Sequence, residues 1–265
     1  MKKHIVSLGL AIFLSQSVFA DDAIRGAEVP LSPDLKLIPI VQKEDNQSLQ
    51  YSVTANYPQI VGTHLSPAAT QFNQLASAMA KQKIQAFIAD VKQNQSYVQH
   101  LPEAVRHNNL KIDYDLDVLK PQNSILLSIR MRYDTMLAGQ AHPTHVHQVL
   151  NYDLTQAKTL ALADLFKPKA NYLKILSDYC AQSLNAKFKK DNMFIATGTA
   201  PQAKNFSVWN LQADGLLITF DADTVAPYVY GKQEINVPYT MLKNLLASNA
   251  VVLPCVSSAK NCEVE

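Results

Sequence analysis

Residues 112–117 read Ile-Asp-Tyr-Asp-Leu-Asp, and residues 129–134 read Ile-Arg-Met-Arg-Tyr-Asp. Apolar and charged side chains alternate in both stretches, which is typical of β-strands with one buried and one polar face. The stretch between them contains Lys-Pro-Gln-Asn, a turn-forming composition. A turn at residues 121–124 places Asp115 opposite Arg130 and Asp113 opposite Arg132. The sequence therefore predicts an antiparallel hairpin whose apolar side chains share one face and whose charges share the other.

Strand and helix patterns continue on both sides of this hairpin. Ser66 and Pro67 are a favourable cap and first residue for an amphipathic helix that ends at about Gln93. The other elements that we expect are strands at residues 35–42, 49–57 and 146–154, a helix at 171–189, a hairpin around 213–215, a strand at 233–237 and a short helix at 239–246. This order predicts an α+β fold, with antiparallel sheets carrying helices on one face in two similar β-α-β(β) halves.

Composition and charge exclude several functional classes. The chain has 265 residues, of which 48% are apolar and 17% charged, as in an ordinary globular protein. Its seven glycines are too widely spaced to form a glycine-rich nucleotide-binding loop. Without the two lysines of the first 20 residues, 22 basic and 22 acidic side chains remain. A near-neutral chain has no overall electrostatic reason to bind nucleic acid.

The N-terminal segment has the pattern of a secretory signal peptide. Lys2 and Lys3 precede an apolar run, and Ala20 precedes two aspartates. The run is short for a membrane span, which needs about 20 apolar residues. We therefore expect a bacterial protein, periplasmic or secreted, with no membrane span after cleavage. The expected divisions are a signal peptide at residues 1–20, an exposed leader at 21–34, an N-terminal α+β portion at 35–139, a C-terminal domain at 140–247 and a tail at 248–265.

The three cysteines are consistent with an oxidising compartment. Cys255 and Cys262 lie close together near the C-terminus, which favours a disulfide that closes a small loop in the tail. Cys180 shares a helical face with Leu176 and Leu184, and this pattern predicts a buried, inert thiol. A bond between Cys180 and one of the tail cysteines is the alternative, and it would clamp the tail onto that helix.

Histidines and tyrosines provide the candidate binding residues. His142, His145 and His147 form a cluster, and two of them share one face of a strand, as in some zinc or copper sites. No H-E-x-x-H motif accompanies them, so we favour strand-face or loop histidines and expect no metal or other cofactor. Tyr228 and Tyr230 are separated by one residue, and their rings are suited to a surface that binds a protein or a sugar. The alternative is a structural corner with one buried and one partly exposed tyrosine.

Several short phrases occur in a characteristic order along the C-terminal half. They are Ala-His-Pro at residues 141–143, Tyr-Asp-Leu at 152–154 and longer phrases at 160–166, 215–221, 225–231 and 235–239. Together they resemble the RsiV-like extracytoplasmic domain of unknown function. That domain occurs in lysozyme-sensing anti-sigma factors and beside the catalytic domain of PdaC-type peptidoglycan deacetylases, and secreted antigens of the MPT-sixty-four type are similar in fold. The resemblance covers residues 140–246 well and residues 49–139 by element order.

This resemblance implies a non-enzymatic periplasmic binding domain, whose partner is a lysozyme-like cell-wall hydrolase or peptidoglycan. The chain shows no local catalytic signature such as G-x-S-x-G, so we assign no catalytic residue. The residues expected at the binding face are His142, His145, His147, Tyr228 and Tyr230. Two alternatives use the three histidines instead, namely a hydrolase acting on the cell wall and a metal-binding periplasmic protein.

Overall fold

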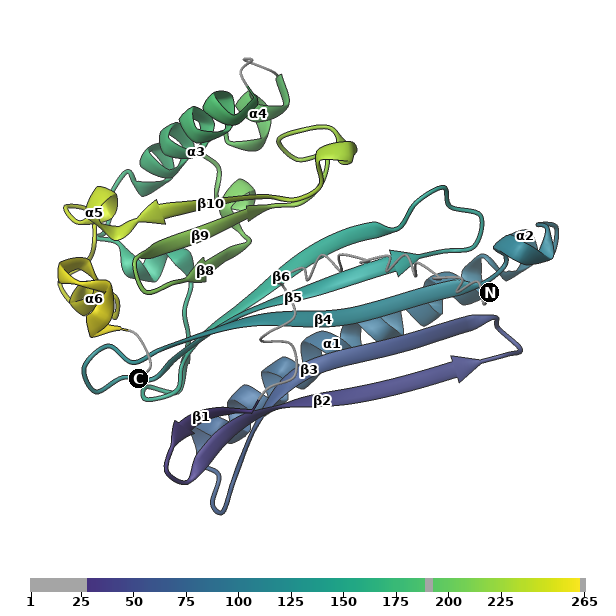
Figure 1. The fold of residues 1–265 in the computed structure, drawn as a ribbon, viewed down its shortest axis with the longest axis horizontal. Coiled ribbons are helices and arrows are strands. Elements are labelled where there is room, and N and C mark those ends of the chain that lie inside the picture. The colour runs from purple at the N-terminus through teal and green to yellow at the C-terminus, as the bar shows by residue number, and fades with distance from the viewer. Residues whose placement is uncertain (1–27, 189–192, 263–265) are drawn as a thin grey trace, which may run out of the picture.

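The computed structural model describes residues 28–188 and 193–262, so the expected signal peptide lies outside the described residues. The chain forms an α+β fold built on two sheets (Figure 1). A large sheet contains the strands β1 to β7, and a small sheet contains β8 to β10. Strand β8 of the small sheet contacts β4, β5 and β6 of the large one, so the small sheet is seated on one end of the large sheet.

The strands of the large sheet follow one another in space in chain order. All neighbours are antiparallel except β3 and β4, which are parallel because a long helix, α1, returns the chain between them to the same end of the sheet. The bounds are β1 Val29–Ser32, β2 Leu35–Asn46, β3 Tyr51–Gly62, β4 Asn108–Leu119, β5 Leu126–Met136, β6 Thr144–Asp153 and β7 Lys158–Thr159. The parallel pair is a difference from the antiparallel sheet that the sequence predicts.

The predicted hairpin register is confirmed. In the pair β4–β5, Asp115 lies opposite Arg130 and Asp113 lies opposite Arg132. Strand β6 then adds His147 beside Arg132. One face of these three strands is therefore lined by charged and histidine side chains.

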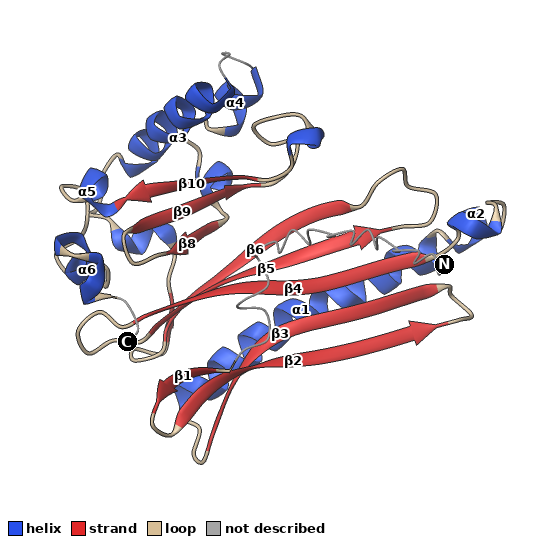
Figure 2. Cartoon of the chain, in the orientation of Figure 1, coloured by secondary structure: helices blue, strands red, loops and turns tan. Residues whose placement is uncertain are grey.

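Helix α1 (Pro67–Gln93) covers the apolar face of the sheet and runs along β3 and β4 (Figure 2). It begins as the sequence predicts, since the Ser66 side chain accepts a hydrogen bond of 3.1 Å from the Ala69 N–H and Pro67 is the first helical residue. The core between helix and sheet contains, among others, Phe72, Phe87, Val53, Ile112 and Met131. The shorter helix α2 (Gln95–Val98) follows.

A second hydrophobic core lies under the small sheet. The strands are β8 Trp209–Leu211, β9 Gly215–Phe220 and β10 Gln233–Pro238, in the spatial order β10-β9-β8. Helix α3 (Tyr172–Phe188) packs on β10, and the helices α4 Met193–Gly198, α5 Tyr239–Leu242 and α6 Leu253–Ser257 complete this lobe. None of the helices among the described residues combines the length and the apolar character needed to cross a membrane.

The structure corrects two expected divisions of the chain. Residues 29–32 of the expected exposed leader form β1, because Leu31 is 2% exposed and belongs to the large core. The expected boundary at residues 139/140 would separate β5 from β6, which are adjacent strands of one sheet. Most of the second hydrophobic core follows β7, but Leu119 of β4 and Leu126 of β5 also belong to it, and with seven and three strands the halves are not similar.

The disulfide that the spacing of the two tail cysteines predicts is present in the structure. Cys255 and Cys262 form a disulfide, and Cys180 is a free, fully buried thiol. Burial raises the pKa of Cys180 to about 12, so this thiol remains protonated and unreactive at neutral pH.

Candidate functional site

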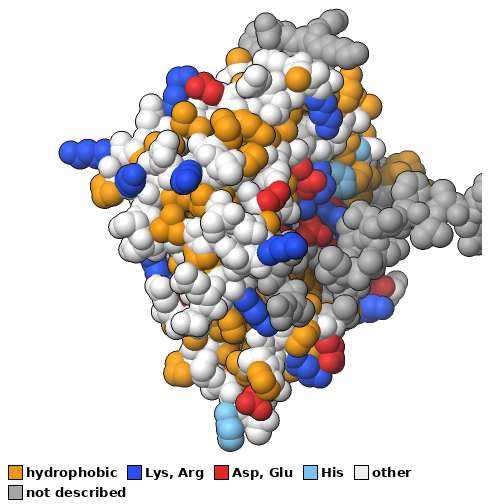
Figure 3. Space-filling view, turned by 60° about the vertical axis from the view of Figure 1, so that its left-hand side comes forward, with side chains coloured by type: hydrophobic (Ala, Val, Ile, Leu, Met, Phe, Trp, Pro, Cys, Tyr) orange, Lys and Arg blue, Asp and Glu red, His pale blue; other side chains and the backbone are white. Residues whose placement is uncertain are grey.

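The polar face of β4, β5 and β6 meets the small lobe and forms the interface between the two sheets. Alternation along the strands directs Asp113, Asp115, Arg130 and Arg132 away from the core beneath α1. In the space-filling view, acidic and basic side chains gather next to one another in the middle of the molecule (Figure 3). Arg130 pairs with Asp115 and Glu234, and Arg132 pairs with Asp113, so the charges of the interface form a paired network.

At one end of the interface, a hydrogen-bond network ties the two sheets together. The Ser128 hydroxyl donates to Asn151 Oδ1 over 2.7 Å and accepts from Asn210 Nδ2 at 2.9 Å and from the Leu211 N–H at 2.8 Å. Asn151 Nδ2 in turn donates to the Trp209 carbonyl over 2.9 Å. These side chains are buried, and their hydrogen bonds hold β8 in one position on β5 and β6, although Asn210 Oδ1 has no hydrogen-bond partner among the described residues.

Arg130 lies at the centre of the interface and is only 6% exposed. Its guanidinium donates to Asp115 Oδ2 over 2.7 Å and to Thr219 Oγ1 over 2.6 Å, and it also donates to Glu234. Burial lowers the pKa of Arg130, but hydrogen bonds and charges from Asp115 and Glu234 outweigh that effect and raise it above its ordinary value. A single buried cation thereby joins β4 and β5 to β9 and β10.

His147 is buried further along the same interface and belongs to a histidine–aspartate pair. Its Nδ1 lies 2.5 Å from Asp221 Oδ1, and its backbone N–H donates to Asp221 Oδ2 over 3.2 Å. The side chain is 2% exposed, and Nε2 has no hydrogen-bond partner among the residues that the structure describes. The pair fastens β6 to the end of β9.

At the exposed end of the interface, the structure brings together three of the expected binding residues. The His142 ring stacks on Tyr228 with centroids 4.0 Å apart, and the His145 ring lies 6.3 Å from the same tyrosine. The Tyr228 hydroxyl donates to the Pro143 carbonyl over 2.7 Å. His145 Nδ1 also lies 2.6 Å from Asp134 Oδ1. His147, the third histidine, is buried and separate from this cluster.

Tyr230 lies on the same loop as Tyr228 but contacts different residues. Its ring packs edge-on against Phe188 at 5.1 Å and remains 57% exposed. Val229, between the two tyrosines, is 84% exposed. The one signal for Val229 in the sequence is its position between the two candidate tyrosines. Residues 227–231 are called the tip loop below.

The tip loop is held in one conformation from both sides. Tyr228–Tyr230 form a single 3-10 turn that follows Pro227 and ends at Gly231, whose φ of 62° favours glycine. Gln233 Nε2 donates to the Tyr230 carbonyl over 2.8 Å. Two anchored residues therefore present the apolar Val229 side chain to solvent on a fixed turn.

The described residues do not assemble a metal site. Within residues 28–188 and 193–262, no three histidine, cysteine or acidic side chains lie close enough together to hold a metal ion. His145 and His147 each direct Nδ1 to a different aspartate.

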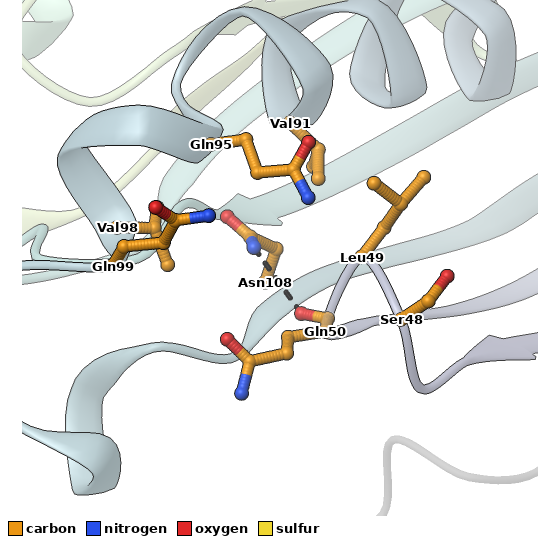
Figure 4. Close-up of a pocket in the computed structure, with 8 residues that line it drawn as sticks. All are labelled: Ser48, Leu49, Gln50, Val91, Gln95, Val98, Gln99 and Asn108. Atoms are coloured by element: carbon orange, nitrogen blue, oxygen red, sulfur yellow. Dashed lines mark hydrogen bonds between the residues drawn. The ribbon is translucent and has the colours of Figure 1, made fainter.

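A small cavity of about 70 Å³ lies at the far end of the large sheet, where β3 and β4 begin (Figure 4). Asn108 points into it and donates from Nδ2 to the Gln50 carbonyl over 3.2 Å. Sites for small organic molecules usually enclose about 300–1,000 Å³, so this space suits a few water molecules and is too small for such a ligand.

One acidic side chain at the interface makes the stability of the fold depend on pH. Burial raises the pKa of Asp117 to about 6, although the charge of Arg130 acts in the opposite direction and Asp115 adds to the rise. A carboxyl with a higher pKa in the folded chain binds its proton more tightly there. Its stabilising contribution is therefore present below about pH 4 and is lost as the pH rises from about 4 to about 6.

Asp117→Asn is expected to raise the free energy of unfolding at pH 7 by about 2 kcal/mol and to flatten its decline between pH 4 and 6. Urea unfolding at several pH values measures both effects. Asp178→Asn is the matched control, since Asp178 is exposed on α3 and pairs with Lys174. An unchanged pH slope in Asp117→Asn would contradict the assignment.

Three comparisons with known proteins place this geometry in context. Residues 163–240, which include both β8 and β9, match DUF3298, a family described as a protein of unknown function. The chain is also similar to the peptidoglycan-N-acetylmuramic acid deacetylase PdaC of Bacillus subtilis (strain 168), with 27% identity over 204 residues. The match covers 76% of this chain and 40% of PdaC, so the chain spans less than half the length of that relative.

Two solved structures share the fold. A DUF3298 family member from Bacteroides fragilis has a TM-score of 0.61 and 18% identity, with 88% of this chain and 99% of that chain covered. A DUF3298 family protein from Pseudomonas aeruginosa PAO1 has a TM-score of 0.54 and 16% identity, with 81% and 95% covered. Both likenesses confirm the predicted α+β class.

Proposed function

We propose that this chain is a non-enzymatic binding domain of the bacterial cell envelope, and that its tip loop recognises a lysozyme-like cell-wall hydrolase. The observation that carries the proposal is the exposure of Val229 and Tyr230, at 84% and 57%, on a loop whose neighbours are anchored. The resemblance to the RsiV-like domain and the similarity to a deacetylase named for peptidoglycan support a role at the cell wall.

The tip loop has the physical properties of a recognition loop. Aromatic side chains are enriched at the centres of protein interfaces, where a few of them contribute most of the binding free energy. A loop that is already ordered loses little conformational entropy on binding. Pro227, Gly231 and the Tyr228–Pro143 hydrogen bond provide that order.

The paired charges next to the loop indicate which interactions carry the affinity. Glu234 accepts hydrogen bonds from both Arg130 and Lys232. Burial raises the pKa of Glu234, but these hydrogen bonds and the two positive charges outweigh burial, so the pKa is lower than its ordinary value. Asp134 is likewise engaged by Arg132 and His145. Apolar contacts of the tip loop therefore dominate, and the affinity is expected to depend only weakly on salt.

Biolayer interferometry with an immobilised lysozyme tests the proposal. Tyr230→Ala and Val229→Ser are each expected to weaken binding at least tenfold, since each removes exposed apolar surface at the centre of the contact. Met241→Ala is the matched control, because Met241 is also exposed and apolar, at 53%, but lies on α5 at the other end of β10. Unchanged thermal unfolding shows that the variants are folded.

Two results would contradict the proposal. One is the absence of binding to lysozymes by the intact chain, and the other is equal binding by the wild type and the tip-loop variants. Retention of the chain on purified peptidoglycan sacculi without retention on lysozyme would assign the domain to the cell-wall glycan instead.

A further inference from the structure

A groove of about 520 Å³ lies at the end of the molecule opposite to the tip loop. It is formed where three connections meet: the β4–β5 turn, the β6–β7 turn and the segment that leads from α5 into α6 (Figure 1). Its volume lies within the range of about 300–1,000 Å³ that small-molecule sites occupy. The lining residues belong to the segments 121–124 and 248–254 together with Gln156.

The lining of this groove carries no charge. Its polar groups are amides and hydroxyls, contributed by Gln122, Asn123, Ser124, Gln156, Ser248 and Asn249. None of these side chains makes a hydrogen bond within the described part of the chain, so their donors and acceptors are available to a ligand. Val251, Leu253 and Pro254 add an apolar wall.

The walls of the groove are held in place before any ligand arrives. The β4–β5 turn is closed by a hydrogen bond of 3.0 Å from the Ser124 N–H to the Pro121 carbonyl. The β6–β7 turn is held by Asp153 Oδ1, which accepts from the Thr155 and Gln156 N–H groups at 2.9 Å. The Cys255–Cys262 disulfide fixes α6, and the Lys120 N–H donates to the Cys262 carbonyl over 3.1 Å.

We propose that this groove binds a neutral, N-acetylated oligosaccharide. An amide side chain both donates and accepts, which matches neighbouring sugar hydroxyls and the acetamido group. The apolar wall suits the acetyl methyl group and the apolar face of a sugar ring. An ionic ligand would find no opposite charge in the lining, so a neutral one is favoured. The groove shares no residue with the tip loop and does not depend on the proposed function.

Titration of the isotope-labelled full chain with tri-N-acetylchitotriose, followed by amide chemical shifts, tests the inference. Shifts are expected at residues 121–124, 156 and 248–254. Cellotriose, which carries hydroxyls in place of the acetamido groups, is expected to bind at least tenfold more weakly. The double variant Asn123→Ala/Asn249→Ala is expected to lose the shifts, and Gln156→Ala to weaken binding as a second, independent variant.

The matched control is Gln74→Ala/Gln93→Ala, which removes two exposed amides from α1 and leaves the shifts unchanged. The inference would be overturned by the absence of shifts, by equal binding of cellotriose, or by shifts confined to the tip loop. A tip-loop variant that loses lysozyme binding but retains the oligosaccharide shifts would support two separate sites.

Discussion

Arg130→Met is expected to lower the free energy of unfolding by about 3 kcal/mol, because it removes the cation from a buried network and leaves its anions in place. Arg130 is 6% exposed and bonds to Asp115, Thr219 and Glu234, which lie on three other strands. Methionine has a similar length but neutralises neither carboxylate. Asp115 and Glu234 are partly exposed, which keeps the loss below that of a fully buried pair.

The same variant is expected to separate the unfolding of the two lobes. Trp209 is the chain's one tryptophan and lies in the small sheet, so its fluorescence reports on that lobe, whereas far-UV circular dichroism reports on the whole chain. In urea, the two transitions of the wild type should coincide and those of Arg130→Met should diverge.

Arg132→Met is the matched control, since the ion pairs of Arg132 are formed with Asp113 and Asp134 of its own sheet. It is expected to cost about 1 kcal/mol and to leave the transitions together. Equal losses in the two variants would show that Arg130 does not join the sheets.

Phe72→Ala is expected to lower the free energy of unfolding by about 4 kcal/mol, as in other truncations of buried aromatic residues. Phe72 is fully buried on α1, and its ring lies 5.7 Å from that of Tyr152 on β6. The Tyr152 hydroxyl donates to the Ala68 carbonyl over 3.0 Å. The substitution leaves a cavity where the helix contacts β6, and the hydrogen bond nearby limits its collapse.

Thermal and urea unfolding measure this effect. Phe194→Ala provides the control, because Phe194 on α4 is 45% exposed and its loss is expected to cost less than about 1 kcal/mol. A loss below about 1 kcal/mol for Phe72→Ala would show that α1 is not anchored at this point.

Patterns within one element predicted most of the local structure. The alternation at Asp113 and Asp115 and the short turn after them were sufficient to place both residues opposite the correct arginines. Ser66 and Pro67 marked the start of α1 because capping depends on neighbouring residues alone. The spacing of Cys255 and Cys262 favoured the disulfide that the structure contains.

Contacts between distant elements were not predicted. The partners of Arg130 on β9 and β10 lie 89 and 104 residues away, and Asp221 lies 74 residues from His147. No local pattern distinguishes Asp221 or Thr219 from the other polar residues of the chain. The parallel pairing of β3 with β4 was also missed, because it depends on where α1 returns the chain.

The sequence by itself determined the α+β class, the hairpin register and the start of the long helix, since periodicity and capping act over a few residues. Only the tertiary structure decided that His142, His145 and Tyr228 share a surface while His147 is buried. It also decided that three separate turns enclose a groove. The physical reason is that alternation assigns a side chain to a face, whereas the element packed against that face determines whether the side chain is exposed, paired or buried.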